Sequence, residues 1–305
     1  MRILFLGPGL MGESMARLLL QAGHTVEVLL NRNPGPVDRL VAEGATQATD
    51  VIVSAAESDI VLSMLPNLPE IEELLFTKGI ATAMKPGSLF LTMSTVSPDG
   101  IKQVASALAE KGIDILDAPV SGGTVKAASG TLTIMAGGER TVYDRYLPVL
   151  QVMGDHIYYT GETGTGQVVK LCNNLLAAMI MAANAEVLTM GVKAGADANL
   201  IRDILLQSTG ANRLLAEWLP RTMLSDRYEP GFALKLMYKD IELAMQMGKS
   251  TGTPLFLGGM AQQLYRMAMG GDGTQSDSDY SVVSTVYQDA AGVRIAGSIS
   301  VREGD

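Results

Sequence analysis

The chain has 305 residues, 47% hydrophobic and 18% charged, with a formal net charge of −9. This length suggests two domains, and an acidic chain without a block of Lys and Arg argues against a nucleic-acid or anionic-membrane surface. With two histidines, His24 and His156, and one cysteine, Cys172, neither a disulfide framework nor a zinc site of His and Cys alone is available. We expect a cytoplasmic protein without a metal.

The first half of the chain alternates short apolar runs with helical patterns. Strands are predicted at 3–6, 25–30, 60–65, 88–93, 113–117, 132–136 and 156–159. Helices are predicted at 10–22, 34–43, 69–76, 97–111 and 139–153. Such alternation favours right-handed βαβ units and a mainly parallel sheet. We therefore expect an α/β Rossmann domain over 1–162.

The second half changes character after the glycine-containing segment 161–164. One long helix is predicted over 164–194. Shorter helices are predicted at 198–208, 212–219, 234–251, 256–270 and 280–291. This pattern predicts an all-α domain over 163–293, joined to the first by the long interdomain helix, and a polar tail over 294–305 that lies on the surface or is partly disordered.

No segment resembles a membrane span or a signal sequence. The apolar run 3–6 is too short for a signal sequence, and the apolar stretch 175–183 is shorter than the roughly 20 residues that span a bilayer. No Gly-x-Ser-x-Gly motif follows a suitable strand. An enzyme built from this chain would therefore carry its proton on Lys, Tyr, Asp or Glu.

A glycine-rich loop follows the first predicted strand and opens a helix. It reads Gly7-Pro8-Gly9-Leu10-Met11-Gly12, which matches Gly-x-Gly-x-x-Gly. In such a loop Gly7 permits a tight turn, Gly9 lets a pyrophosphate approach the backbone, and Gly12 allows close packing of helix on strand. The loop therefore predicts dinucleotide binding, although glycine-rich turns also occur for packing alone.

The residues at the end of the second predicted strand contact the ribose of a bound dinucleotide. A carboxylate there selects NAD, whereas an arginine accommodates the 2′-phosphate of NADP. This chain has Asn31 and Arg32 at that point, while Glu27 lies too early, in the middle of the strand. NADP is therefore the preferred cofactor and NAD stays possible, since Arg32 could also be a solvated loop residue.

Several further motifs occur in a fixed order along the chain. They are Gly23-His24, Leu65-Pro66-Asn67, Met93-Ser94-Thr95, Asp117-Ala118-Pro119-Val120-Ser121-Gly122-Gly123, Gly130-Thr131-Leu132-Thr133-Ile134-Met135, Gly164-x-Gly166 with Lys170 and Asn173-Asn174, and Lys239-Asp240. With the glycine loop, they make the chain resemble the β-hydroxyacid dehydrogenases, the group of 3-hydroxyisobutyrate dehydrogenase, tartronate semialdehyde reductase and 2-(hydroxymethyl)glutarate dehydrogenase. The resemblance covers nearly the whole chain.

The resemblance implies a hydride-transferring oxidoreductase for a small β-hydroxy acid and its semialdehyde, with its active site in the cleft between the two domains. It assigns Lys170 as the catalytic acid/base and places Ser121, Gly122, Gly123 and Asn174 against the substrate. It places Leu65, Pro66, Asn67, Thr95 and Lys239 near the cofactor. The long helix and the apolar second domain indicate burial against a partner subunit, and we expect a homodimer or a homotetramer.

Residue spacing agrees with these assignments. Lys170 and Asn174 are four residues apart, so they share one face of the long helix. Asn173 points elsewhere, and the sequence favours a packing role and a functional role for its amide equally. A lysine in a dry cleft can have its pKa lowered, so it can donate or accept a proton. The alternatives are ordinary surface ion pairs for Lys170 and Lys239, and a simple tight turn at Ser121–Gly123.

One position departs from the family pattern. Lys126 stands where the family usually has Gly, beside the substrate loop. It could receive a second anionic group of the substrate, or it could be a solvated loop lysine, and Arg213 is a weaker candidate for the same task. Two other functions stay open: an imine reductase, against which Lys170 argues, and a non-catalytic NADP-binding scaffold.

Overall fold

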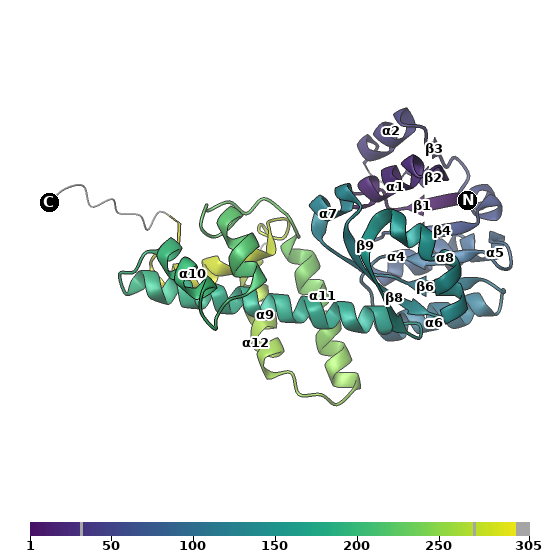
Figure 1. The fold of residues 1–305 in the computed structure, drawn as a ribbon. Helices are drawn as coiled ribbons and strands as arrows, with labels where there is room; N and C mark the ends of the chain where they lie inside the picture. The colour runs from purple at the N-terminus through teal and green to yellow at the C-terminus, as the bar shows by residue number, and fades with distance from the viewer. Residues whose placement is uncertain (31–32, 271–272, 297–305) are drawn as a thin grey trace. The chain divides into compact units, whose positions relative to one another are not determined.

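The computed structural model describes residues 1–30, 33–270 and 273–296 (Figure 1). They form two compact units, Met1–Leu171 and Cys172–Asp305. The first unit holds a nine-stranded sheet and the second is built from helices. The predicted fold class, a Rossmann domain followed by an all-α domain with a long helix, is confirmed.

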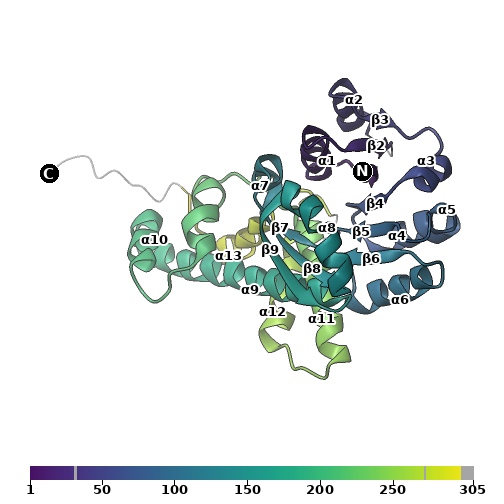
Figure 2. The ribbon, with the colours of Figure 1, turned by 45° about the vertical axis from the view of Figure 1, so that its right-hand side comes forward.

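The sheet of the first unit is parallel over most of its width. Its strands are β1 (Arg2–Leu6), β2 (Thr25–Leu29), β3 (Thr46–Gln47), β4 (Ile60–Ser63), β5 (Leu89–Thr92), β6 (Asp114–Asp117), β7 (Val120–Ser121), β8 (Leu132–Gly138) and β9 (Gly154–Gly161). Their order is β3-β2-β1-β4-β5-β6-β8-β7, with β9 beside β8 (Figure 2). Strand β8 pairs antiparallel with β6 and β7 and parallel with β9.

Helices cover both faces of this sheet. Side chains alternate along β1, so Ile3 and Phe5 join one hydrophobic core while Leu4 and Leu6 join the other. The first core is closed by α1 (Gly12–Gln21), α2 (Gly35–Ala42), α7 (Gly123–Ser129) and α8 (Arg140–Met153). The second is closed by α3 (Val51–Glu57), α4 (Leu68–Glu72), α5 (Ile80–Ala83) and α6 (Pro98–Ala109).

Helix α9 (Thr165–Lys193) begins in the first unit and continues into the second. The second unit adds α10 (Ala198–Leu206), α11 (Leu234–Ser250), α12 (Phe256–Ala268) and α13 (Ser284–Ala291). Two predicted helices differ in kind: 212–219 is a π-helical turn (Leu214–Trp218) with a 3₁₀ turn (Leu219–Arg221), and 280–291 starts as a 3₁₀ turn (Tyr280–Val283). Tyr265 and Tyr280 stack in the core of this unit.

The predicted tail is only partly a surface segment. Ile295 is 1% exposed, and its N–H donates to the Oε1 of Gln288 at 2.9 Å. Burial of an isoleucine side chain contributes about 1.5–3 kcal/mol to holding this part of the chain on the protein. Residues 297–305 lie outside the described part of the structure.

The length and composition of α9 alone would allow it to cross a membrane. Its most apolar window has a mean hydropathy of 1.7, and 44% of that window is buried within the protein. Core helices of soluble proteins pass the same test of length and hydropathy. The apolar character of α9 is therefore weak evidence for a membrane.

Candidate active site

Four neighbouring strands end at the same level of the sheet. Leu6 at the end of β1 pairs with Ser63 at the end of β4, Ser63 pairs with Thr92 of β5, and Thr92 pairs with Asp117 of β6. The strand order reverses direction between β1 and β4. In open α/β sheets, ligands bind at the carboxyl ends of the strands beside such a switch point. The loops that follow these four strands are therefore the candidate site.

The glycine loop after β1 has the geometry that a dinucleotide requires. Gly7 has a φ of 90°, and a Cβ there would lie 2.7 Å from the carbonyl oxygen of Met64. A Cβ on Gly12 would lie 2.3 Å from the carbonyl oxygen of Gly7, so α1 packs closely on the loop. Nothing lies within 4 Å of a Cβ on Gly9, which leaves the backbone there open to a pyrophosphate. The residues fit an NAD(P) cofactor.

Two arginines compensate the acidic residue that follows this loop. Glu13, in the first turn of α1, accepts hydrogen bonds from Arg39 at 2.8 and 2.7 Å and from Arg17 at 2.9 Å. These bonds, from Arg39 above all, lower the pKa of Glu13 to about 2, although partial burial opposes them. The charge of Glu13 beside a phosphate loop is thus balanced by cations.

The other cofactor candidates lie on the neighbouring loops or outside the described residues. Leu65, which is buried, Pro66, which is exposed, and Asn67, which donates to Glu70 at 2.9 Å, follow β4, and half-buried Thr95 follows β5. Asn31 and Arg32, on which the choice of NADP depends, lie outside the described residues.

The segment Ser121-Gly122-Gly123 passes from β7 directly into α7, a short helix that the sequence did not reveal. Gly122 has a φ of 141° and Gly123 a φ of 65°, so both positions favour glycine. A Cβ on Gly122 would lie 2.6 Å from the Cβ of Lys126. Both readings of this segment, a tight turn and a row of exposed N–H groups, agree with this backbone.

The two extra cations, Lys126 and Arg213, lie in different settings. The aliphatic stem of Lys126 covers Gly122, and its charge is among those that lower the pKa of Asp155, after the hydrogen bond from His156. Arg213 is exposed and forms an ion pair with Glu217 at 2.9 Å, one helical turn away. Arg213 therefore forms an exposed surface ion pair, and such pairs contribute little to stability.

Lys170 is a buried lysine on α9, with 8% of its surface exposed. The alternative from the sequence, an ordinary lysine on the surface, would be mostly exposed. Lysine is seldom buried unless the protein uses or pairs its charge. Burial therefore favours a functional assignment of this side chain.

Asn174 lies four residues further along α9 and is 4% exposed. Its Nδ2 donates to the buried carboxylate of Asp240 at 2.6 Å, and its Oδ1 accepts from Asn173 at 2.9 Å. Lys239 Nζ lies 3.2 Å from the other oxygen of Asp240. These contacts fix which end of the Asn174 amide carries the donors, and its nitrogen has a second N–H besides the one that binds Asp240. Asn173, which is exposed, thus contacts Asn174.

Three buried polar residues were not singled out from the sequence. Asp117 and Gln167 are fully buried in the first unit, and Asp240 is 1% exposed in the second. Asp117 and Asp240 belong to two of the motifs given above, but those motifs predicted a role only for neighbouring residues such as Ser121 and Lys239. A carboxylate next to a candidate lysine, as in Lys239-Asp240, is a signal that sequence inspection could have used.

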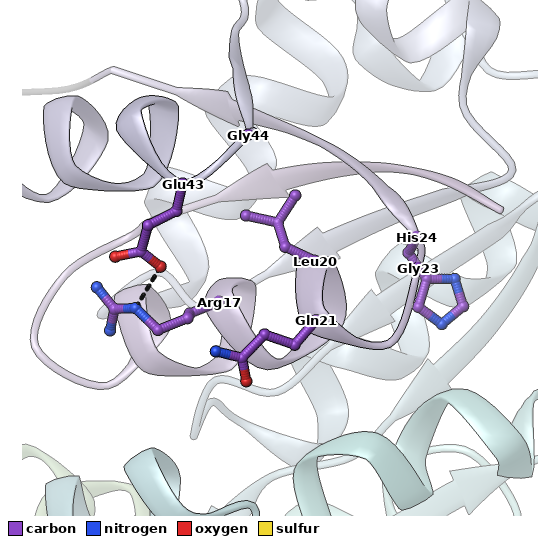
Figure 3. A pocket seen from close by; sticks show the side chains of 7 residues that line it. All are labelled: Arg17, Leu20, Gln21, Gly23, His24, Glu43 and Gly44. Atoms are coloured by element: carbon purple, nitrogen blue, oxygen red, sulfur yellow. Dashed lines mark hydrogen bonds and ion pairs between the residues drawn. The ribbon is translucent and has the colours of Figure 1, made fainter.

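A hollow in the first unit is lined by residues of α1, of the turn before β2 and of the turn after α2 (Figure 3). Its lining includes His24, just before β2 begins, and the ion pair of Arg17 with Glu43 at 2.6 Å. Burial, with the charge of the N-terminus as a smaller cause, lowers the pKa of His24. The hollow lies at the amino end of β2 and takes no part in the candidate site.

Comparison with known proteins agrees with the fold and with the loops. Residues 2–161 match the NAD-binding domain of 6-phosphogluconate dehydrogenase, and residues 164–286 match the family described as "NAD-binding of NADP-dependent 3-hydroxyisobutyrate dehydrogenase". The chain is 39% identical to 2-(hydroxymethyl)glutarate dehydrogenase of Eubacterium barkeri, over 97% of this chain and 98% of that protein.

Solved structures give the same result. The 3-hydroxyisobutyrate dehydrogenase of Mycobacterium tuberculosis, solved with L-serine, is 32% identical with a TM-score of 0.85, over 93% of this chain and 98% of that one. An imine reductase of Streptomyces aurantiacus is 20% identical with a TM-score of 0.64, over 94% and 99%, and shares the fold only. The chain belongs to the β-hydroxyacid dehydrogenase family of NAD(P)-dependent oxidoreductases that act on CH–OH groups.

Proposed function

We propose that this protein interconverts a small β-hydroxy acid and its semialdehyde with NADP(H), and that Lys170 is the general acid/base. The observation that carries the proposal is the buried Lys170 on the same helix as Asn174, whose amide is held by Asp240. The alternative of an imine reductase rests on fold alone, and a scaffold that binds only cofactor would not need this buried polar set.

Different residues transfer the proton and bind the substrate in the proposed reaction. The bound cofactor supplies or accepts the hydride at its nicotinamide ring. Lys170 donates a proton to the carbonyl oxygen in reduction and takes the hydroxyl proton in oxidation. Ser121, Gly122 and Gly123 offer a hydroxyl and backbone N–H groups to the substrate carboxylate, and the second N–H of Asn174 binds a substrate oxygen. The protein thus binds a small anionic substrate.

A rapid-mixing screen tests this function. NADPH and NADH are each mixed with glyoxylate, tartronate semialdehyde, succinate semialdehyde and methylmalonate semialdehyde, and oxidation of the cofactor is followed in a single turnover. Fast oxidation of NADPH by one aldehyde acid supports the proposal and defines the substrate class. Tight binding of NADPH without turnover on any of them would instead support the scaffold.

We propose NADP as the preferred cofactor because Arg32 follows β2. A guanidinium that pairs with the 2′-phosphate contributes about 1.5–3 kcal/mol, which is about tenfold to a hundredfold in affinity. Arg32→Ala is therefore expected to weaken NADPH binding by that factor while NADH binding stays the same, as measured by quenching of intrinsic fluorescence. An equal loss for both cofactors would rule out the 2′-phosphate as the partner of Arg32.

We propose that the protein is a cytoplasmic homodimer or homotetramer that binds neither nucleic acid nor membrane. One face of α12 supports the assembly, because Phe256, Met260 and Met267 are 82%, 67% and 64% exposed. Side chains four and eleven positions apart share one face of a helix, and large exposed apolar side chains on one face, here with exposed Gln263 among them, are typical of an interface.

The assembly predicts the behaviour of a variant. Met260→Glu places a charge in the middle of the apolar face of α12, so the variant is expected to elute as a smaller species in size-exclusion chromatography with light scattering. Leu200→Glu, at an equally apolar and 58% exposed position on α10, is the control. A parent protein that is already monomeric at micromolar concentration would refute the assembly.

A further inference from the structure

We propose that Asp117 and Gln167 are positioning residues for the reaction: together they hold the first turns of α9 against the loops that follow β5 and β6, and thereby hold Lys170. This inference rests on the proposed role of Lys170. Both side chains have 0% of their surface exposed, and both belong to the same compact unit as Lys170.

Asp117 binds the start of α9 from a distant strand. Its carboxylate accepts hydrogen bonds from the N–H of Gly164 at 2.6 Å and from the N–H of Gln167 at 3.0 Å. The first N–H groups of a helix have no partner inside the helix, and the side-chain oxygens of Asp117 accept two hydrogen bonds there. Asp117 is thus an N-terminal cap that is supplied from β6, four residues before Ser121.

Gln167 binds the other loop. Its Oε1 accepts from the N–H of Val96 at 2.9 Å, and its Nε2 donates to the carbonyl oxygen of Ser94 at 3.1 Å. These two residues flank Thr95, a candidate for contact with the cofactor. One side chain of α9 therefore fixes the backbone on both sides of Thr95, and it lies three residues before Lys170 on the same helix.

Glycines let the backbones close around these contacts. A Cβ on Gly166 would lie 2.3 Å from the carbonyl oxygen of Met135 and 2.8 Å from the Oδ2 of Asp117. A Cβ on Gly137, in β8, would lie 2.7 Å from the Oδ1 of Asp117. A side chain at either position would clash, so both positions require glycine for the start of α9 to pack this closely on β6 and β8.

The arrangement has a consequence for catalysis. Lys170 lies in the turn of α9 directly after Gln167, so a displacement of that turn moves the ammonium relative to the Thr95 and Ser121 loops. Misplacement of a reacting group by about 1 Å can cost about a hundredfold in rate. Asp117 and Gln167 need not touch substrate or cofactor to have this effect.

Gln167→Met tests the inference, because methionine has a similar length and makes neither hydrogen bond. We expect kcat to fall by about ten- to a hundredfold with little change in KM or in NADPH affinity. Gln167→Glu keeps the oxygen that accepts from the Val96 N–H, so its kcat is expected to fall less than that of Gln167→Met. Gln288→Met is the matched control, since buried Gln288 also accepts a backbone N–H, from Ile295, and donates to Ser284.

A double-mutant cycle with Lys170→Ala separates positioning from general stability. If Gln167 acts through Lys170, Gln167→Met causes no further loss of kcat in the Lys170→Ala background. A Gln167→Met enzyme that loses thermal stability as Gln288→Met does, but keeps kcat, overturns the inference. A Lys170→Ala enzyme with the parent rate overturns the proposed function instead. If Gln167→Met does not fold, Gln167→Glu against the same control decides the outcome.

Discussion

Replacement of Lys170 by alanine is expected to lower the rate of hydride transfer by about a hundred- to ten-thousandfold, the range of one positioned acid or base. The cofactor loops do not include this side chain, so the affinity for NADPH should not change. Lys193→Ala is the control, because Lys193 is an exposed lysine in the last turn of the same helix. Single-turnover oxidation of NADPH with the best aldehyde acid measures both variants.

Lys170→Arg distinguishes proton transfer from simple attraction of an anion. Arginine keeps the positive charge but does not release its proton at neutral pH. An acid/base role therefore predicts that Lys170→Arg is nearly as slow as Lys170→Ala, and that added methylamine restores part of the rate of the alanine variant. Full activity of Lys170→Arg would mean that the charge, and not the proton, is what the reaction uses.

The regular elements of this fold could be predicted because their patterns are local. The strand ending at Leu6 and the helix beginning at Gly12 are marked by an apolar run, glycines and helical spacing. The N-terminal cap of α6 could also be predicted, from the place of Ser97 directly before Pro98. In the structure, Ser97 accepts a hydrogen bond from the N–H of Gly100 at 3.2 Å. Local chemistry decides these boundaries.

Short and long-range features could not be predicted in the same way. Helix α3 has a clear cap, because Asp50 accepts from the N–H groups of Ile52 and Val53, yet its seven residues show too little periodicity to be noticed. The pairing of Asp117 with α9 joins residues that are 47 and 50 positions apart. No local pattern carries such a contact, so the buried network behind Lys170 became visible only in three dimensions.

Asp117 also predicts how stability depends on pH. Burial raises the pKa of its carboxyl from 3.8 to about 7, although N–H donors such as Gly164 and Gln167 lower it. Between these values the folded protein keeps a proton that the unfolded chain has lost. The free energy of unfolding therefore falls as pH rises, by about 1.4 kcal/mol per pH unit and about 4 kcal/mol over the whole window.

Comparison with Asp117→Asn isolates this group, because asparagine keeps an acceptor oxygen and does not titrate. Urea unfolding followed by circular dichroism between about pH 5 and pH 7 should show the parent losing stability relative to the variant as pH rises. Glu13 does not disturb this window, since its pKa is lowered from 4.5 to about 2 and its contribution is lost only as pH falls through those values. A constant difference between parent and variant would mean that the N–H groups at the start of α9 outweigh burial. Asp117 would then be ionised throughout this range.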